Sequence, residues 1–135
     1  MTPPKAVLDA SALLAFLFEE PGVELVTAAL ADTCAISAVN FAEVLSKLSD
    51  RGQDVDQAAE RMASQGLTGA ALIVVPVEEP QAREIARLRE KTQGTGLSLG
   101  DRACLALAYS LKLPVLTADR AWLSLGLGID VRMVR

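Results

Sequence analysis

Short apolar segments alternate with helix-like segments along the whole chain, and this alternation restricts the possible folds more than any other feature of the sequence. The apolar segments are "KAVLD" (5–9), "CAIS" (34–37), "LIVVPV" (72–77), "VLTA" (115–118) and "IDVRMV" (129–134). Each is short enough for a strand and rich in aliphatic residues. Because strands that alternate with helices form parallel sheets, we expect an α/β fold with a mainly parallel sheet of five strands.

The segments between these strands have the spacing and the terminal residues of helices. We expect helices at 10–18, 23–30, 54–65, 80–93 and 97–111, another in "AVNFAEVLSKL" and a short one in "DRAWLSLG". In "AVNFAEVLSKL" the apolar residues share one face, which leaves Asn40, Glu43 and Lys47 on the opposite face. Pro76 and the alternating pattern of 129–134 place their two strands at the sheet edges.

Length and composition indicate one soluble domain. The 135 residues are 51% hydrophobic and 22% charged, which predicts a single globular domain over residues 1–135. The apolar run at 6–18 is too short to span a bilayer and ends at "EEPG" instead of a cleavage site. Cys34 and Cys104 lie in apolar surroundings, where a thiol behaves as a small core residue. We therefore expect a cytoplasmic protein with no membrane segment and no disulfide.

Histidine is absent, and its absence excludes several kinds of catalysis. Ser-His-Asp and Cys-His systems need an imidazole, and two cysteines without histidine cannot build a zinc site. Any chemistry must therefore use carboxylates, hydroxyls, Lys or Arg, with or without a hard metal ion. The net charge of −4 gives no broad basic surface for a nucleic acid.

Four acidic residues lie at or near the starts of predicted helices. They are Asp9, Glu43, Asp101 and Asp119. Taken singly, each has a structural explanation as a helix-capping residue. Glu43 follows Asn40 by three residues and Asp101 follows Ser98 by three, which is the spacing of a capping box.

Taken together, the four carboxylates are expected at one edge of the sheet. In a parallel sheet, the carboxyl ends of the strands and the amino ends of the following helices share the edge where ligands bind. Asp9, Glu43 and Asp119 lie at such junctions, and the helix of Asp101 runs back to the same edge. Converging carboxylates repel one another unless a cation is present, and oxygen ligands alone suit Mg²⁺ or Mn²⁺. Such a site predicts hydrolysis of a phosphodiester by a metal-activated water.

Four segments of the chain, in order and spacing, resemble the PIN-domain ribonucleases, most closely the VapC-type toxins of bacterial toxin–antitoxin pairs. The segments are "AVLDASALLAFL", "ISAVNFAEVLSKL", "LSLGDRACLALA" and "VLTADRAW". The resemblance implies a Rossmann-like domain with sheet order 3-2-1-4-5 and assigns the acidic quartet of the family to the four carboxylates above. It also implies Mg²⁺ or Mn²⁺ dependence, RNA cleavage, a homodimer and inhibition by a small cognate antitoxin.

We expect Asp9, Asp101 and Asp119 to contact the metal ion, directly or through water, and Glu43 to complete the site or orient the attacking water. Other side chains are expected to support the site or bind substrate. They are Ser11, Asn40, Thr117, Arg102 and Arg120. Ordinary capping is an alternative role for the hydroxyl groups, and the two arginines flank the acidic edge, where a phosphate would lie.

A basic stripe offers a second possible contact with RNA. Arg83, Arg87 and Lys91 recur every four residues, which places three like charges on one helix face. The alternative is a solvated face on which Glu79 and Glu84 relieve the repulsion.

Two other functions stay open at this stage. A phosphatase of the haloacid-dehalogenase type would use Asp9 as a nucleophile, but it needs a second Asp two residues later, where this chain has Ser11. A catalytically silent binding module would keep the fold for dimer or antitoxin contacts. Without histidine, a nuclease cannot use paired imidazoles to cleave through the RNA 2′-hydroxyl. The nuclease interpretation therefore predicts products with a 5′-phosphate and a 3′-hydroxyl.

Overall fold

Five parallel strands form one sheet in the computed structural model, which describes residues 2–135. The strands are β1 (Ala6–Leu8), β2 (Cys34–Ser37), β3 (Leu72–Val75), β4 (Val115–Thr117) and β5 (Val131–Met133). Their order is β3-β2-β1-β4-β5, and every neighbouring pair is parallel. The predicted α/β class and the 3-2-1-4-5 order are therefore confirmed. β3 ends just before Pro76, and β3 and β5 are the two edge strands, as predicted.

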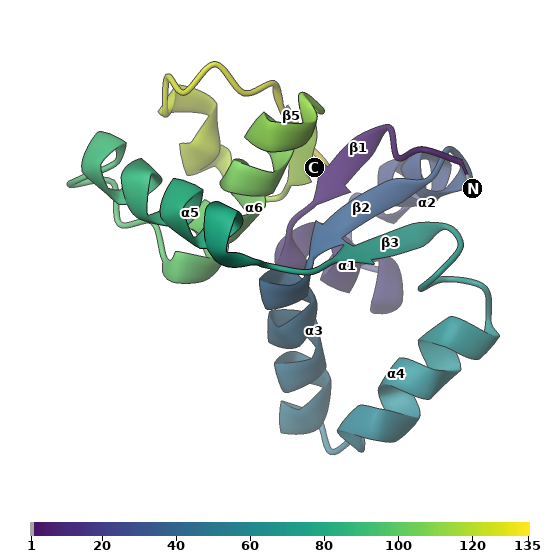
Figure 1. The fold of residues 1–135 in the computed structure, drawn as a ribbon. Helices are drawn as coiled ribbons and strands as arrows, with labels where there is room; N and C mark the ends of the chain where they lie inside the picture. Colours follow the sequence, from purple (N-terminus) through teal and green to yellow (C-terminus); the bar gives the residue numbers. More distant parts are fainter. Residues whose placement is uncertain (1) are drawn as a thin grey trace.

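The helices connect the strands in the predicted sequence. They are α1 (Ala10–Leu17), α2 (Val23–Ala31), α3 (Ala38–Asp50), α4 (Val55–Ser64), α5 (Glu79–Lys91) and α6 (Leu99–Leu111). The segment predicted as a short α-helix forms a 3-10 helix, η1 (Arg120–Ser124). Figure 1 shows α5 and α6 side by side on one side of the sheet, with α3 and α4 as a separate pair. Within residues 2–135, no helix has the length and apolarity needed to cross a bilayer.

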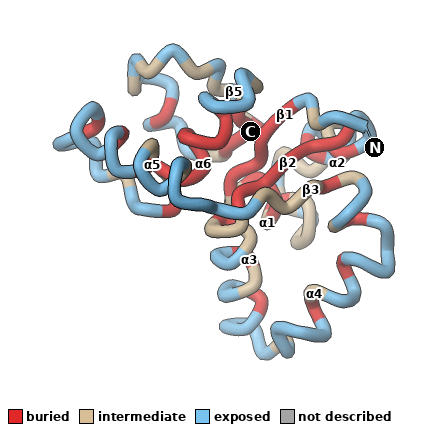
Figure 2. Tube along the Cα trace, in the orientation of Figure 1, coloured by how far each residue is buried: buried red, intermediate tan, exposed pale blue. Residues whose placement is uncertain are grey.

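The sheet separates two hydrophobic cores. Leu8 and Ile36 point into a core built with α1 to α4, whereas Val7 and Ala35 point into a core built with α5, α6 and η1. This division follows from the alternation of side chains along a strand. Figure 2 shows the buried residues concentrated along the central strands and α6. The sheet edge at the carboxyl ends of β1 and β4 is therefore held rigidly from both sides.

The two cysteines are free and buried, as predicted. Cys34 belongs to the core on the α1 side of the sheet, and Cys104 belongs to the core on the α6 side. Because the sheet lies between them, they cannot form a disulfide in this fold.

Candidate active site

Asp9 lies directly after the central strand β1 and is the N-cap of α1, as its position in the sequence predicts. Its Oδ1 accepts hydrogen bonds from the Ser11 hydroxyl at 2.7 Å and the Ala12 amide at 2.8 Å, and its Oδ2 accepts one from the Thr117 hydroxyl at 2.5 Å. Only 6% of Asp9 is exposed. Burial raises its pKa above 3.8, and the negative charge of Asp101 adds to the rise, although the three hydrogen bonds oppose it.

Two hydroxyl groups join the loop after β1 to the loop after β4. The Ser11 hydroxyl accepts a hydrogen bond from the Ala118 amide at 3.0 Å, and the Thr117 hydroxyl accepts one from the Asp119 amide at 3.0 Å. Both hydroxyls also donate to the carboxylate of Asp9. Ser11 and Thr117 therefore orient Asp9 and connect it to the backbone of Ala118 and Asp119, respectively.

This connection makes Thr117 a test of the site. Thr117→Val keeps the shape of the side chain but leaves Oδ2 of Asp9 and the amide of Asp119 without their partner. We expect a loss of about 1–3 kcal/mol in the free energy of unfolding, measured by urea denaturation, because buried polar groups lose their hydrogen bonds. Thr117→Ser, which keeps the hydroxyl, is the matched control. Equal stability of the two variants would contradict this role of the hydroxyl.

Asp101 forms a capping box with Ser98 at the start of α6. The Ser98 amide donates to Oδ2 of Asp101 at 3.0 Å, and the Asp101 amide donates to the Ser98 hydroxyl at 3.1 Å. This confirms the predicted capping role of Asp101, which leaves its second carboxylate oxygen available. Asp119 likewise caps η1, with Oδ1 accepting a hydrogen bond from the Ala121 amide at 3.0 Å.

Three of the four carboxylates raise the pKa of one buried thiol. The pKa of Cys104 is well above its usual range, first because the thiol is buried and then because of the negative charges of Asp9, Asp101 and Glu43. The charges of all three carboxylates therefore act on this thiol of α6. The backbone amide of Asp119 is linked to Asp9 through the Thr117 hydroxyl.

The surroundings of Asn40 differ from the prediction. The N-cap of α3 is Ser37, so Asn40 lies inside the helix and forms no capping box with Glu43. Asn40 is 1% exposed and shares the buried face of α3 with Val44 and Leu48, whereas the apolar spacing had placed it on the opposite face. The pattern of apolar residues did not reveal this, because the amide is buried by a polar contact with another helix.

That contact joins α3 to the start of α6. Nδ2 of Asn40 donates to Oε1 of Glu43 at 2.8 Å and to the carbonyl of Gly100 at 2.9 Å. Oδ1 of Asn40 is buried without a hydrogen-bond partner. Gly100 was not predicted as part of the site. The sequence feature that could have pointed to Gly100 is its position in the first turn of a long helix, where glycine is unfavourable unless packing requires it.

The predicted substrate-binding arginines have different surroundings. Arg102 is buried, and its Nη1 donates to the carbonyl of Ile85 at 2.8 Å. Its guanidinium thus ties α6 to α5, and its predicted role in phosphate binding stays a prediction. Arg120 is exposed and beside Asp119, so its role in binding phosphate stays a prediction.

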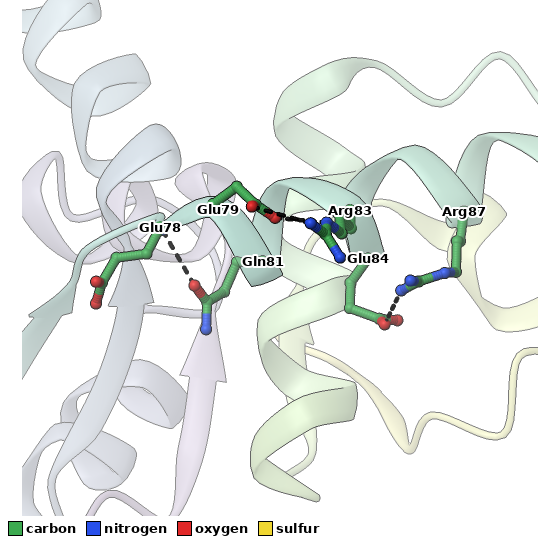
Figure 3. Close-up of polar contacts among 6 residues, drawn as sticks. All are labelled: Glu78, Glu79, Gln81, Arg83, Glu84 and Arg87. Atoms are coloured by element: carbon green, nitrogen blue, oxygen red, sulfur yellow. Dashed lines mark hydrogen bonds and ion pairs between the residues drawn. The ribbon is translucent and has the colours of Figure 1, made fainter.

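The basic stripe on α5 is compensated by acidic neighbours on the same helix. Arg83 forms an ion pair with Glu79 at 2.5 Å, and Arg87 pairs with Glu84. Figure 3 shows both pairs along the exposed face of α5. The alternative interpretation, a solvated face with internal ion pairs, is therefore the one confirmed for Arg83 and Arg87.

The donor groups at this edge fit a hard cation. Among residues 2–135, no three His, Cys, Asp or Glu side chains form a ready-made metal cage. Mg²⁺, however, usually binds through one or two carboxylates and keeps several waters, so a full cage is not required. None of the four carboxylates forms an ion pair within the described chain. An all-oxygen set without a cationic partner, next to the unpartnered Oδ1 of Asn40, suits Mg²⁺ or Mn²⁺.

The sequence of residues 6–126 matches the PIN domain family. The match covers most of the chain, so this protein belongs to the PIN domain family. Comparison with curated proteins finds no match.

Solved structures of toxin–antitoxin systems are similar over nearly the full chain. VapBC-5 from Mycobacterium tuberculosis, described as a member of the VapBC family, is 30% identical, with 98% of this chain and 99% of that chain covered and a TM-score of 0.58. A toxin–antitoxin complex from Klebsiella pneumoniae is 20% identical, with 96% and 98% covered and a TM-score of 0.74. DNA-bound VapBC from Salmonella typhimurium is 15% identical, with 98% and 100% covered and a TM-score of 0.73. The last two show the shared fold, and VapBC-5, at 30% identity, agrees with the PIN domain match.

Proposed function

We propose that this protein is a metal-dependent endoribonuclease and the toxin of a toxin–antitoxin pair, acting in the cytoplasm. The observation that carries the proposal is the buried Asp9 at the end of the central strand, with Asp101 close enough to raise its pKa. A carboxylate in such a place is unfavourable for stability, and such positions are typical of functional sites. Membership in the PIN domain family supports nuclease chemistry there.

The carboxylates divide into two roles in this proposal. Asp9, Asp101 and Asp119 hold Mg²⁺ or Mn²⁺, directly or through water. When bound, the cation lowers the pKa of a water molecule and offsets negative charge on the phosphate. Glu43 orients the attacking water and accepts its proton, and exposed Arg120 contacts a phosphate of the RNA.

The products follow from the residues available. The water oxygen bonds to phosphorus, the bond from phosphorus to the 3′-oxygen breaks, and that oxygen leaves as a 3′-hydroxyl after gaining a proton. The phosphate stays on the 5′-oxygen of the other fragment. A route through the RNA 2′-hydroxyl commonly relies on imidazoles, and the chain has no histidine.

The proposal is tested with purified protein and total RNA in Mg²⁺, in Mn²⁺ and in EDTA, followed by mapping of the new ends. We expect EDTA to lower the cleavage rate by about 100-fold or more, because metal assistance contributes several kcal/mol to catalysis. Addition of Mn²⁺ in excess of EDTA should restore the rate. Cyclic phosphate ends, or cleavage that EDTA does not change, would contradict the mechanism.

A catalytically silent binding module is the second candidate. It is favoured by the hydrogen bonds that already engage both oxygens of Asp9. The same experiment separates the two, because a silent module cleaves no RNA with either metal.

The partners of the proposed toxin are RNA, a second copy of this chain and a small cognate antitoxin. Support for the antitoxin comes from the similar structures, which are toxin–antitoxin or VapBC complexes.

A further inference from the structure

The carboxylate of Glu43 packs directly on the backbone of α6 at Gly100. A Cβ atom at position 100 would lie 2.5 Å from Oε2, 2.6 Å from Oε1 and 2.6 Å from the carboxyl carbon of Glu43. Real contacts of a Cβ atom are longer than this, so any other residue at position 100 would displace the carboxylate. Gly100 does not have a positive φ, unlike the other eight glycines, so its backbone conformation does not require glycine. The space taken by Glu43 is what requires it.

Asn40 holds the same carboxylate through a hydrogen bond. Both hydrogen bonds of its amide group go to acceptors, namely Oε1 of Glu43 and the carbonyl of Gly100. An exchanged amide orientation would place an oxygen against both acceptors, so the donor assignment is determined by the contacts. Asn40 is buried and gains these two bonds while its own Oδ1 stays unpartnered. A buried acceptor without a partner is costly, which indicates that the position serves Glu43 more than stability.

We propose that Asn40 and Gly100 are positioning residues that together hold the carboxylate of Glu43 over the first turn of α6, beside Asp101. The inference rests on the proposed nuclease function for its effect on cleavage, but the placement of Glu43 is independent of it. Asn40 supplies the directional contact, and Gly100 supplies the space. Neither residue needs to touch RNA or metal to act.

Gly100→Ala tests the space without changing any charge. The atoms that a new methyl group meets are the end of a flexible side chain, so we expect a folded protein in which Glu43 has moved. We expect the cleavage rate to fall about 100-fold, because a displacement of about 1 Å can cost that much in catalysis. Adding Glu43→Asp, which shortens the side chain by one methylene, should restore part of the rate. A general structural defect would not be relieved by shortening Glu43.

Asn40→Ala tests the directional contact. It should lower the cleavage rate in the wild-type background and have no further effect in a Glu43→Ala background, because both changes then act on the same group. Asn40→Asp, which replaces the two donors with an oxygen that faces two acceptors, should lower the rate at least as much as Asn40→Ala. An effect of Asn40→Ala of equal size in both backgrounds would show that Asn40 acts elsewhere and would overturn its part of the proposal.

Thermal denaturation in EDTA gives a readout that does not depend on activity. Alanine is favoured over glycine in a helix, so Gly100→Ala should raise Tm more in a Glu43→Ala background than in the wild-type background, where Glu43 must move. Equal shifts in Tm would overturn the placement of Glu43, as would wild-type cleavage by Gly100→Ala. If the wild-type protein cleaves no RNA, the proposed function fails, and the Tm comparison still decides whether Gly100 and Glu43 compete for space.

Discussion

Asp9→Asn is expected to lower RNA cleavage by about 100-fold or more while the protein stays folded. Asparagine caps helices as well as aspartate does, and its side-chain oxygen can accept the same bonds from Ser11 and Ala12. What the variant loses is a charge at the centre of the proposed metal site, where an effect of this size is typical of an essential catalytic group. The rate is measured with Mg²⁺ and with Mn²⁺. Wild-type cleavage by Asp9→Asn would contradict the proposed site.

The same variant is expected to gain stability at neutral pH when metal is absent. Burial raises the pKa of Asp9 in the folded protein above 3.8, its ordinary value, which is the value in the unfolded chain. As pH rises from about 3.8 through the raised pKa, the unfolded chain loses this proton first, so the folded wild-type protein loses stability in that window. Below the window the carboxyl is protonated in both states, and asparagine, which imitates the protonated form, offers no advantage.

The measurement is Tm in EDTA for the wild type and Asp9→Asn from pH 3.5 to pH 7. The Tm of the variant should exceed that of the wild type by an amount that grows through the window and is constant above it. A difference that shrinks as pH rises would mean that the hydrogen bonds lower the pKa of Asp9 more than burial raises it. Asp119→Asn is the matched control, because Asp119 caps a helix in the same way but is not buried.

Trp122→Ala is expected to have the largest effect on stability. Trp122 is 1% exposed and lies in η1, where it packs into the core on the α6 side of the sheet. Removing so large a buried side chain costs about 3–5 kcal/mol, which for a domain of this size lowers Tm by roughly 10 °C or more. Because η1 begins directly after Asp119, cleavage should fall as well. Urea denaturation and the cleavage assay check the two effects.

Trp122→Phe is the control for this variant. Nε1 of Trp122 is buried without a partner, so phenylalanine removes an unsatisfied donor while keeping most of the packing. We expect a much smaller loss of stability than for Trp122→Ala. Equal losses would mean that the indole nitrogen has a partner such as a buried water.

The local parts of the site were predictable because they depend on neighbours in sequence. Asp9 caps the helix that follows its strand, and Asp101 forms the capping box that its spacing from Ser98 predicts. The parallel sheet followed from the alternation of strands and helices, and Pro76 marked an edge. The order of the strands was implied by the resemblance to the PIN-domain family and is confirmed by the fold.

The contacts that the sequence did not predict involve side chains whose partners are distant in sequence. Arg102 was expected to bind phosphate at the acidic edge, and the structure adds a hydrogen bond from Arg102 to the carbonyl of Ile85 on α5. The spacing of the apolar residues placed Asn40 on the opposite face of its helix, yet Asn40 is buried. Helical periodicity fails as a guide where a polar side chain is bonded by another helix.

The sequence by itself therefore determined the fold class, the edge strands and the junctions that carry the four acids, since strand and helix periodicity and capping are properties of short segments. Only the tertiary structure decided which groups surround those acids. The contact between Asn40 and Gly100 spans 60 residues, and the contact between Asp9 and Thr117 spans 108. Such contacts form when helices pack on a common sheet, and no local pattern specifies which of their side chains will meet.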